Sequence, residues 1–572
     1  MKKVFKCLKK YTLESILGPL FKLFEATLEL IVPLVIAAII DNGIGKSDEG
    51  YVVKMCLVLL LLGAVGLAFS VTAQYFAARA AVGSVTKLRS MLFSHISSLS
   101  YSEIDTLGTS NMLTRMTSDT NQVQTGINLA LRLLLRSPFV VFGAMIMAFT
   151  IDFDSALIFA AVIPLLCVVV FGIMLISIPL YKKVQTRLDG VVGKTRENLS
   201  GARVIRAFTK EDSEVELFRE RNRELNGAQK FVGAISALLN PLTYVIINVA
   251  IIALIYSGAV KVNSGVLTDG EVVALYNYMS QILIELIKMA NLIITITKAI
   301  ASAGRISSVF DIKPSVVHGE RTEGPGGAKV ELRGASLTYK SASEPSLSDI
   351  SFKAERGETV GIIGGTGSGK TSLINLIPRF YDATEGEVLI DGANVKEYSG
   401  DALRKKIAVV PQKAVLFAGT IRDNMLWGNE SATDEDIYRA LEIAQAREVA
   451  DGKGGLDGRV EQGGKNFSGG QRQRLTIARA LVAKPEILIL DDSASALDFA
   501  TDAALRTAIR NMNGDTTVFI VSQRASSVMR ADKIVVLEDG CADGVGTHGE
   551  LLLSSTVYRE IYESQFGEVK AV

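Results

Sequence analysis

The chain has 572 residues, which is too long for a single hydrophobic core. Its formal net charge is +1 at pH 7, so there is no overall attraction to nucleic acid and no nucleic-acid partner is expected. Hydrophobic residues make up 48% of the chain and the mean hydropathy is +0.31, with almost all long apolar stretches in roughly the first 300 residues. The composition therefore predicts a membrane-embedded N-terminal part and a soluble C-terminal part.

Six apolar stretches are long enough to cross a membrane, since a transmembrane helix needs about 20 predominantly apolar residues. They lie near Leu13–Ile40, Val53–Ala78, Leu129–Ile151, Ser155–Pro179, Ile235–Val260 and Val272–Ile300. The first follows a basic start but is long and lacks a small-residue cleavage site, so we interpret it as a retained helix. The sequence predicts an all-α six-helix transmembrane domain over residues 1–312.

Charged residues interrupt these apolar stretches. Arg132 and Arg136 lie one helical turn apart, and so do Glu25 and Glu29, which places each pair on one helix face. Two interpretations stay open: a polar cavity wall, or ion pairing between helices with snorkelling at the interface. For Glu285, in the sixth stretch, the cavity is the favoured expectation.

The connections between the stretches alternate in length and charge. Those after the first, third and fifth stretches are short and neutral or acidic, whereas the other two are long and rich in lysine and arginine. The positive-inside rule then places the long connections and both termini in the cytoplasm. We expect an integral protein of a bacterial inner (cell) membrane, with helices that continue well beyond the bilayer.

The second half has a different pattern. Residues 313–329 are rich in glycine and contain two prolines, Pro314 and Pro325, a composition that predicts a linker. Beyond them, short β-branched stretches alternate with helical patterns, near Thr359–Ile363, Glu387–Ile390, Ile407–Val410, Ile487–Leu490 and Thr517–Val521. This alternation predicts an α/β domain with a largely parallel sheet over residues 330–572.

A phosphate-binding loop follows the strand Val360–Ile363 and precedes a helical stretch. Its residues are Gly364, Gly365, Thr366, Gly367, Ser368, Gly369, Lys370 and Thr371. The glycines allow backbone N–H groups to converge on phosphate, Lys370 is expected to contact the β- and γ-phosphates, and Thr371 to bind Mg²⁺. The pattern therefore predicts ATP and Mg²⁺ as cofactors and an α/β P-loop NTPase domain.

A second nucleotide element is the apolar strand Ile487–Leu490, which ends in a carboxylate. Asp491 is expected to hold Mg²⁺, directly or through water. A strand that ends in Asp is common by itself, and the phosphate-binding loop upstream makes this interpretation specific.

The C-terminal half resembles the ATP-binding domain of the ABC transporter family. The resemblance rests first on a segment that matches the family signature, formed by Phe467, Ser468, Gly469, Gly470 and Gln471. It implies that Tyr339 stacks on adenine. Gln412 matches the Q-loop, and the resemblance implies that Gln412 both helps to bind the metal ion and belongs to the catalytic residues. Ser495–Asp498 matches the D-loop.

The whole chain resembles the exporter branch of that family, in which six helices precede one ATPase domain. The resemblance implies alternating access, in which two halves clamp each ATP between the P-loop of one and the signature of the other. It also implies two coupling helices that touch the ATPase domains, expected near Thr117–Val123 and Ala202–Glu211. An import role is disfavoured, because importers usually carry the two parts on separate chains.

Two positions depart from the family pattern, and both concern hydrolysis. The family places Glu directly after the strand-ending Asp as general base, but here the residue is Asp492. The family also places His in the switch loop, but here it is Gln523, which can bind phosphate without carrying a positive charge. Because Asp is one methylene shorter than Glu, its carboxylate falls about one ångström short, and such a displacement can cost about 100-fold in rate.

These departures lead to the hypothesis of a degenerate subunit in a heterodimeric multidrug exporter. The chain would bind ATP with little hydrolysis, and its intact signature would complete the competent site of a second, non-identical half-transporter. Amphipathic drugs or lipids are the expected substrates. The alternatives are a homodimeric lipid or peptide exporter, and an ATP-gated channel or regulator that does not transport.

Overall fold

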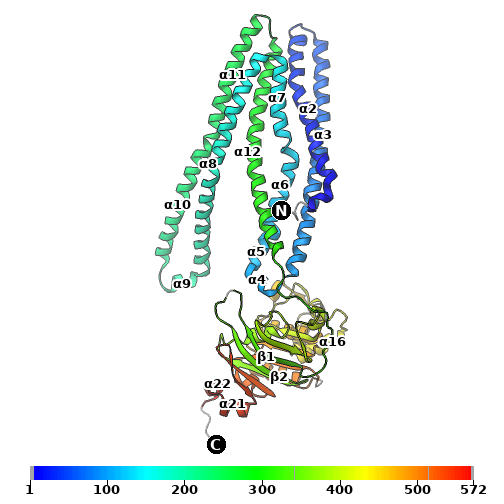
Figure 1. Cartoon of the computed structure of the whole chain (residues 1–572), viewed down its shortest axis with the longest axis vertical. Coiled ribbons are helices and arrows are strands. Elements are labelled where there is room, and N and C mark those ends of the chain that lie inside the picture. Colours follow the sequence, from blue (N-terminus) through cyan, green and yellow to red (C-terminus); the bar gives the residue numbers. More distant parts are fainter. Residues whose placement is uncertain (1–5, 341, 513–514, 568–572) are drawn as a thin grey trace. The chain divides into compact units, whose positions relative to one another are not determined.

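The computed structural model describes residues 6–340, 342–512 and 515–567 and divides into two compact units. The helical unit comprises Met1–Ser97 and Ser110–Ile312. The α/β unit comprises Lys313–Val572 together with Ser98–Thr109, a short segment from the connection after the second span. Figure 1 shows the chain coloured along its sequence.

The helical unit contains six segments long and apolar enough to cross a membrane, so the six predicted spans are confirmed. Their bounds are Lys6–Ile44, Glu49–Ser97, Thr109–Ile151, Phe153–Ser200, Glu211–Asn263 and Asp269–Asp311. The α-helices within them are α2 (Thr12–Ala38), α3 (Glu49–Ser97), α5 (Thr109–Thr114), α6 (Thr120–Leu133), α7 (Arg136–Ile151), α8 (Phe153–Ser200), α10 (Glu211–Ala237), α11 (Leu239–Asn263) and α12 (Asp269–Asp311). At 1.5 Å per residue, α3 is about 70 Å long, so it extends far beyond a bilayer core of about 30 Å.

Small residues let the helices of this unit approach closely. Ala73 and Ala77 of α3 are fully buried, and a Cβ added at Gly18 of α2 would lie 3.4 Å from the backbone nitrogen of Ala77. Where α6 crosses α12, a Cβ at Gly126 would lie 2.2 Å from the Cβ of Ala299. Because lipid tails compete for apolar contacts, such close backbone packing contributes strongly to association in a membrane.

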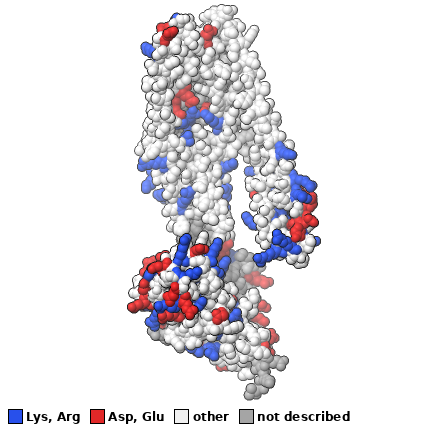
Figure 2. Space-filling view, turned by 180° about the vertical axis from the view of Figure 1, so that it is seen from behind, with Lys and Arg blue, Asp and Glu red and all other residues white. Residues whose placement is uncertain are grey.

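Charged side chains inside the helical unit pair with one another. Arg136 Nη1 donates to Glu285 at 2.6 Å and Nη2 donates to Glu29, which joins α7 to α12 and α2. Lys288 adds a 2.8 Å ion pair with Glu285. Figure 2 shows one such group of charges on an otherwise uncharged stretch of helical surface. The expectation that Glu285 lines a cavity is wrong, since the residue is 2% exposed. Its carboxylate is paired instead, because an unpaired charge at this depth in a membrane would be costly.

Arg132 lies one turn away in a different setting. With Gln124, Thr125, Asn128 and Leu129 it lines a small cavity of about 190 Å³ on α6. Arg136 therefore forms ion pairs between helices, whereas Arg132 borders a cavity.

The two segments expected to form coupling helices lie at different places in the helical unit. Thr117–Val123 lies within the helical unit, in the stretch that leads into α6. The segment that packs with the α/β unit is instead α4 (Tyr101–Leu107). In Figure 1, α9 (Ala202–Ala207) forms the tip between α8 and α10, and none of its residues is buried.

The α/β unit contains three sheets. The main sheet has the order β12-β11-β3-β10-β9-β6, and all its pairs are parallel except β11 with β12. A separate antiparallel sheet has the order β2-β1-β4-β5, and β7 pairs with β8. The strands are β1 (Val330–Leu337), β2 (Leu347–Ala354), β3 (Thr359–Gly364), β4 (Glu385–Ile390), β5 (Ala393–Asn394), β6 (Ile407–Val410), β7 (Gly419–Thr420), β8 (Arg459–Val460), β9 (Ile487–Asp491), β10 (Thr517–Ser522), β11 (Lys533–Glu538) and β12 (Cys541–Gly546).

Besides α4, the described part of this unit contains ten α-helices. They are α13 (Lys370–Leu376), α14 (Gly400–Lys406), α15 (Ile421–Leu426), α16 (Asp434–Ile443), α17 (Arg447–Asp451), α18 (Gly469–Val482), α19 (Phe499–Arg510), α20 (Ala525–Val528), α21 (His548–Ser554) and α22 (Thr556–Phe566). The parallel strands β3, β9 and β10 are adjacent, so the segments that follow their carboxyl ends meet at one edge of the sheet.

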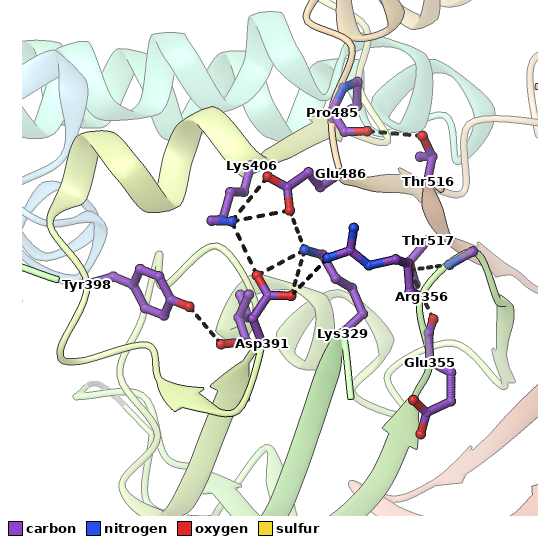
Figure 3. Close-up of polar contacts among 12 residues, drawn as sticks. Lys329, Glu355, Arg356, Asp391, Tyr398, Lys406, Pro485, Glu486, Thr516 and Thr517 are labelled. Carbon is purple, nitrogen blue, oxygen red and sulfur yellow. Dashed lines mark hydrogen bonds and ion pairs between the residues drawn. The ribbon is translucent and has the colours of Figure 1, made fainter. Parts of the chain in front are cut away.

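A buried ion-pair cluster joins the antiparallel sheet to the main sheet (Figure 3). Lys329, which precedes β1 and whose side chain is 1% exposed, pairs with Asp391 at 2.8 Å and with Glu486, the residue before β9. Lys406, at the end of α14, pairs with both acids, at 3.2 and 3.1 Å. Burial alone would raise the pKa of Asp391, but its hydrogen bonds from Lys329 and Lys406 outweigh burial and lower that pKa.

We expect Lys329→Ala to destabilise the α/β unit by about 2–3 kcal/mol, because it removes a buried ammonium that hydrogen-bonds Asp391 and leaves Lys406 to pair with both acids. Lys353→Ala is the matched control: Lys353 is 61% exposed and its partner Glu331 keeps an ion pair with Arg333, so the loss should stay below about 1 kcal/mol. Hydrogen exchange of β1 and β4 in the full chain measures both. Equal protection in the two variants would contradict the role given to the cluster.

Candidate nucleotide-binding site

The loop between β3 and α13 has the backbone shape that its glycines permit. Gly367 and Gly369 have φ of +85° and +94°, a region that favours glycine. A Cβ at Gly364 would lie 2.2 Å from the carbonyl oxygen of Leu537, so this position has no room for a side chain. Gly369 is the N-cap of α13, and the loop therefore leads into a helix N-terminus, where backbone N–H groups favour anions.

Lys370 folds back over this loop. Its ammonium donates to the carbonyl oxygens of Gly364 and Gly365, at 3.0 and 2.5 Å, and to Ser368 Oγ at 3.3 Å. Burial lowers the pKa of Lys370, and the nearby Asp492 and Asp491 partly offset that effect. The ammonium is thus held at the loop by groups that phosphate oxygens can replace.

Thr371 and Asp491 form an oxygen-rich corner beside the loop. The Thr371 hydroxyl donates to the two carboxylate oxygens of Asp491, at 3.3 and 3.2 Å. Asp491 ends β9 and is 6% exposed, and burial raises the pKa of its carboxyl. A hydroxyl and a carboxylate fit Mg²⁺, which prefers oxygen ligands and takes the remaining ones from phosphate and water.

The two positions that depart from the family pattern line the same cavity, of about 710 Å³, as the phosphate-binding loop. Asp492 follows β9 with φ +44°, and its Oδ2 accepts from Gln412 Nε2 at 3.3 Å. Burial raises the pKa of Asp492, which makes its carboxylate a stronger base. Gln523 follows β10 and also lines the cavity. This site therefore differs from the family pattern in the shorter side chain of Asp492 and in the uncharged side chain of Gln523. The basicity of the Asp492 carboxylate is not what differs.

The signature residues lie elsewhere in the α/β unit. Ser468 is the N-cap of α18: its Oγ accepts from Gln471 N at 3.3 Å, and its own N–H donates to Gln471 Oε1 at 3.0 Å. Ser468 and Gly469 are exposed, whereas Phe467 is 4% exposed and packs in the core. None of the described residues that line the cavity belongs to this segment. The chain therefore does not bring its own P-loop and signature together.

Tyr339 packs against the edge of Tyr381, with ring centroids 5.0 Å apart, and donates to Ser372 Oγ at 3.0 Å. The helix α4 binds to the rest of the α/β unit next to Tyr339, through Lys340 and Tyr381. Glu103 is 4% exposed, accepts from Lys340 Nζ at 2.6 Å and also accepts from Ser315. Tyr381 in turn donates to Asp105. The segment after the second span is therefore bound to the residue that directly follows Tyr339.

We expect Glu103→Gln to loosen α4, with hydrogen exchange over residues 98–109 rising about tenfold, because a buried charged hydrogen bond is lost. Burial alone would raise the pKa of Glu103, but hydrogen bonds from Lys340 and Ser315 outweigh it and hold the pKa below the ordinary value. The attachment is then fully present above a pH of about 4.3 and is lost as pH falls through the lowered pKa. Thr106→Ala is the control, since that hydroxyl bonds only within α4.

Sequence reasoning missed seven residues that line the cavity, and Pro345, Ser372 and Val521 are three of them. Glu344 and Ser346 come from the loop before β2, and Asp539 and Gly540 from the turn between β11 and β12. The Asp-Gly pair between two apolar stretches is a hairpin signal. Its place beside the phosphate-binding loop depends on the parallel pairing of β11 with β3.

The fold and the site define a P-loop ATPase fused to a six-helix membrane domain. Residues 15–286 match the family model of the ABC transporter transmembrane region, and residues 347–495 match the family model described as ABC transporter. An uncharacterized ABC transporter ATP-binding protein of Mycobacterium tuberculosis is 36% identical over 556 residues, covering 96% of this chain and 95% of the relative. The chain therefore belongs to the ABC transporter family.

Other similarities are consistent with this assignment. An ATP-dependent lipid A-core flippase of Vibrio parahaemolyticus is 27% identical over 572 residues, covering 99% of this chain and 98% of the flippase. The fold is similar to the structure of a bacterial Atm1-family ABC exporter with ATP bound, with a TM-score of 0.80, 22% identity and 99% of each chain covered. The chain is an integral membrane protein and an ATP-driven ABC transporter, and its α/β unit is the ATPase domain.

Proposed function

We propose that this chain is one half of a heterodimeric exporter of amphipathic drugs or lipids in a bacterial cell membrane. Its own site binds ATP with Mg²⁺ at Thr371, Asp491 and Gln412 but hydrolyses it slowly. One observation carries this proposal: Asp492 and Gln523 line the same cavity as Lys370. The groups that bind phosphate are complete, while the two that the family uses for hydrolysis are replaced.

The signature supports the second half of the proposal. Ser468 and Gln471 cap the 14-residue helix α18, and Ser468 and Gly469 at its start are exposed. Exposed backbone N–H groups at a helix N-terminus favour an anion such as a γ-phosphate. A second chain that supplies Glu and His would place its own ATP there and hydrolyse it.

Co-purification with sequencing of any second chain is the first test. A heterodimer contains a non-identical ABC half that carries Glu after its strand-ending Asp and His in its switch loop. ATP-dependent dye transport by that pair in proteoliposomes then supports the drug or lipid substrate class. Robust ATP hydrolysis by the purified chain alone would overturn the proposal.

A homodimeric lipid exporter is the second candidate, and the similarity over nearly the full length to lipid A-core flippases favours it. It predicts that the chain purifies alone as a dimer and that added lipid stimulates its ATP hydrolysis. A non-transporting regulator predicts no stimulation by any substrate. The same liposome experiment therefore separates the three.

A further inference from the structure

A second cavity lies in the α/β unit between α19 and the segment that contains α20. Its volume is about 390 Å³, within the range of small-molecule sites. It shares no lining residue with the nucleotide cavity. None of the motifs that bind nucleotide accounts for it.

Positive charge dominates the lining. Arg506, Arg510 and Arg530 all border the cavity, and none of its described lining residues is acidic. Arg506 is held in place by an ion pair with Asp502 at 2.8 Å. Among the described residues, by contrast, no ion pair involves Arg510 or Arg530, although Arg510 donates to the carbonyl oxygen of Arg530. Two guanidinium groups therefore retain donors for an anion.

A buried hydroxyl gives an independent indication of a ligand. Ser527 lines the cavity, is 4% exposed, and its Oγ has no hydrogen-bond partner among the described residues. Buried hydroxyl groups are normally paired, because leaving one unpaired loses the hydrogen bond it made with water. A polar ligand atom in the cavity would provide the partner.

The rest of the lining is apolar. Ile509, Ile520 and Met529 border the same space, so the site combines an apolar wall with cationic groups. Inorganic phosphate alone would leave that wall without a contact. A purely apolar ligand would leave the guanidinium groups and the Ser527 hydroxyl unsatisfied.

We propose that this cavity binds a small anionic amphiphile, a phosphate or carboxylate group carried on a short apolar chain. The anion pairs with Arg510 and Arg530, the Ser527 hydroxyl donates to it, and the chain packs on Met529 and Ile520. Such a ligand contacts two helices that follow nucleotide motifs. The helix α19 begins directly after Asp498 of the D-loop, and α20 begins two residues after Gln523 of the switch loop. The proposal does not depend on whether the exporter is a heterodimer.

Calorimetric titration of the full chain with hexyl phosphate tests this, with the P-loop saturated by a non-hydrolysable ATP analogue and Mg²⁺. We expect saturable binding that weakens about tenfold in Arg510→Gln and in Arg530→Gln, because each removes a charge-assisted hydrogen bond. Ser527→Ala should weaken binding about fivefold, and it leaves no partner unpaired in the empty protein. Arg439→Gln, an exposed arginine on α16, is the matched control.

Two further ligands separate the parts of the proposal. Hexanol should bind at least tenfold more weakly than hexyl phosphate if the guanidinium groups carry recognition. Inorganic phosphate should also bind more weakly, because it lacks the chain. Equal binding of hexanol, equal binding of phosphate, or no effect of the three cavity variants would each overturn the proposed site.

Discussion

Ser468→Ala is expected to reduce ATP hydrolysis by the assembled exporter about 100-fold, because removal of one donor to transition-state charge has that scale of effect. The Ser468 hydroxyl now caps α18, where it accepts from Gln471 N. In the proposed pair of halves, this N-terminus would face the ATP held by the partner. Asp492→Ala, in the same pair, should change the rate little, since it alters only the site that we propose to be slow.

Steady-state ATP hydrolysis of the purified pair measures both variants. Thr433→Ala is a control for helix capping alone, because Thr433 makes the same type of capping box at α16. If Thr433→Ala were as harmful as Ser468→Ala, the loss would reflect folding rather than phosphate binding. The opposite ranking, with Asp492→Ala the more harmful of the two site variants, would contradict the division of roles between the halves.

The double variant Asp492→Glu with Gln523→His is expected to raise hydrolysis at this chain's own site about 100-fold, because it restores the position of the general base and a positive charge. Both side chains line the nucleotide cavity, and Asp492 already accepts from Gln412. Burial raises the pKa of Asp492, so the gain should come from reach rather than from basicity.

Single-turnover hydrolysis of bound ATP gives the cleanest measure, because it does not require product release. Each single variant should recover only part of the gain. Lys370→Ala added to the double variant should abolish the activity by removing the phosphate-binding ammonium. An unchanged rate in the double variant would mean that another feature limits this site.

The local motifs could be predicted because each is a contiguous pattern. The glycines before Lys370 permit the positive φ that the loop has at Gly367 and Gly369, and the apolar strand before Asp491 places a carboxylate at the edge of a sheet. The six spans followed from length and hydropathy in the same way. The strand near Glu387–Ile390 was also found, but it belongs to the antiparallel sheet, since hydropathy does not determine which strand pairs with which.

Contacts over long sequence separations could not be predicted. Glu285 was expected at a cavity, yet it pairs with Arg136, which lies 149 residues away. The attachment of α4 through Glu103 and Lys340 was likewise missed, because its partners are 237 residues apart. The choice between cavity and ion pair depends on which helices are neighbours, and helical periodicity gives only the face of one helix.

Six membrane-spanning helices, a P-loop for ATP and an ABC signature could be predicted from contiguous stretches of sequence, and so could the presence of Asp492 and Gln523 where the family has Glu and His. The packing of the α/β unit places these two residues in one cavity with Lys370 and leaves Ser468 outside it. It also brings three arginines together around a second cavity. The physical reason is that motif chemistry is local, whereas a site is formed by strands and helices that pack together from distant parts of the chain.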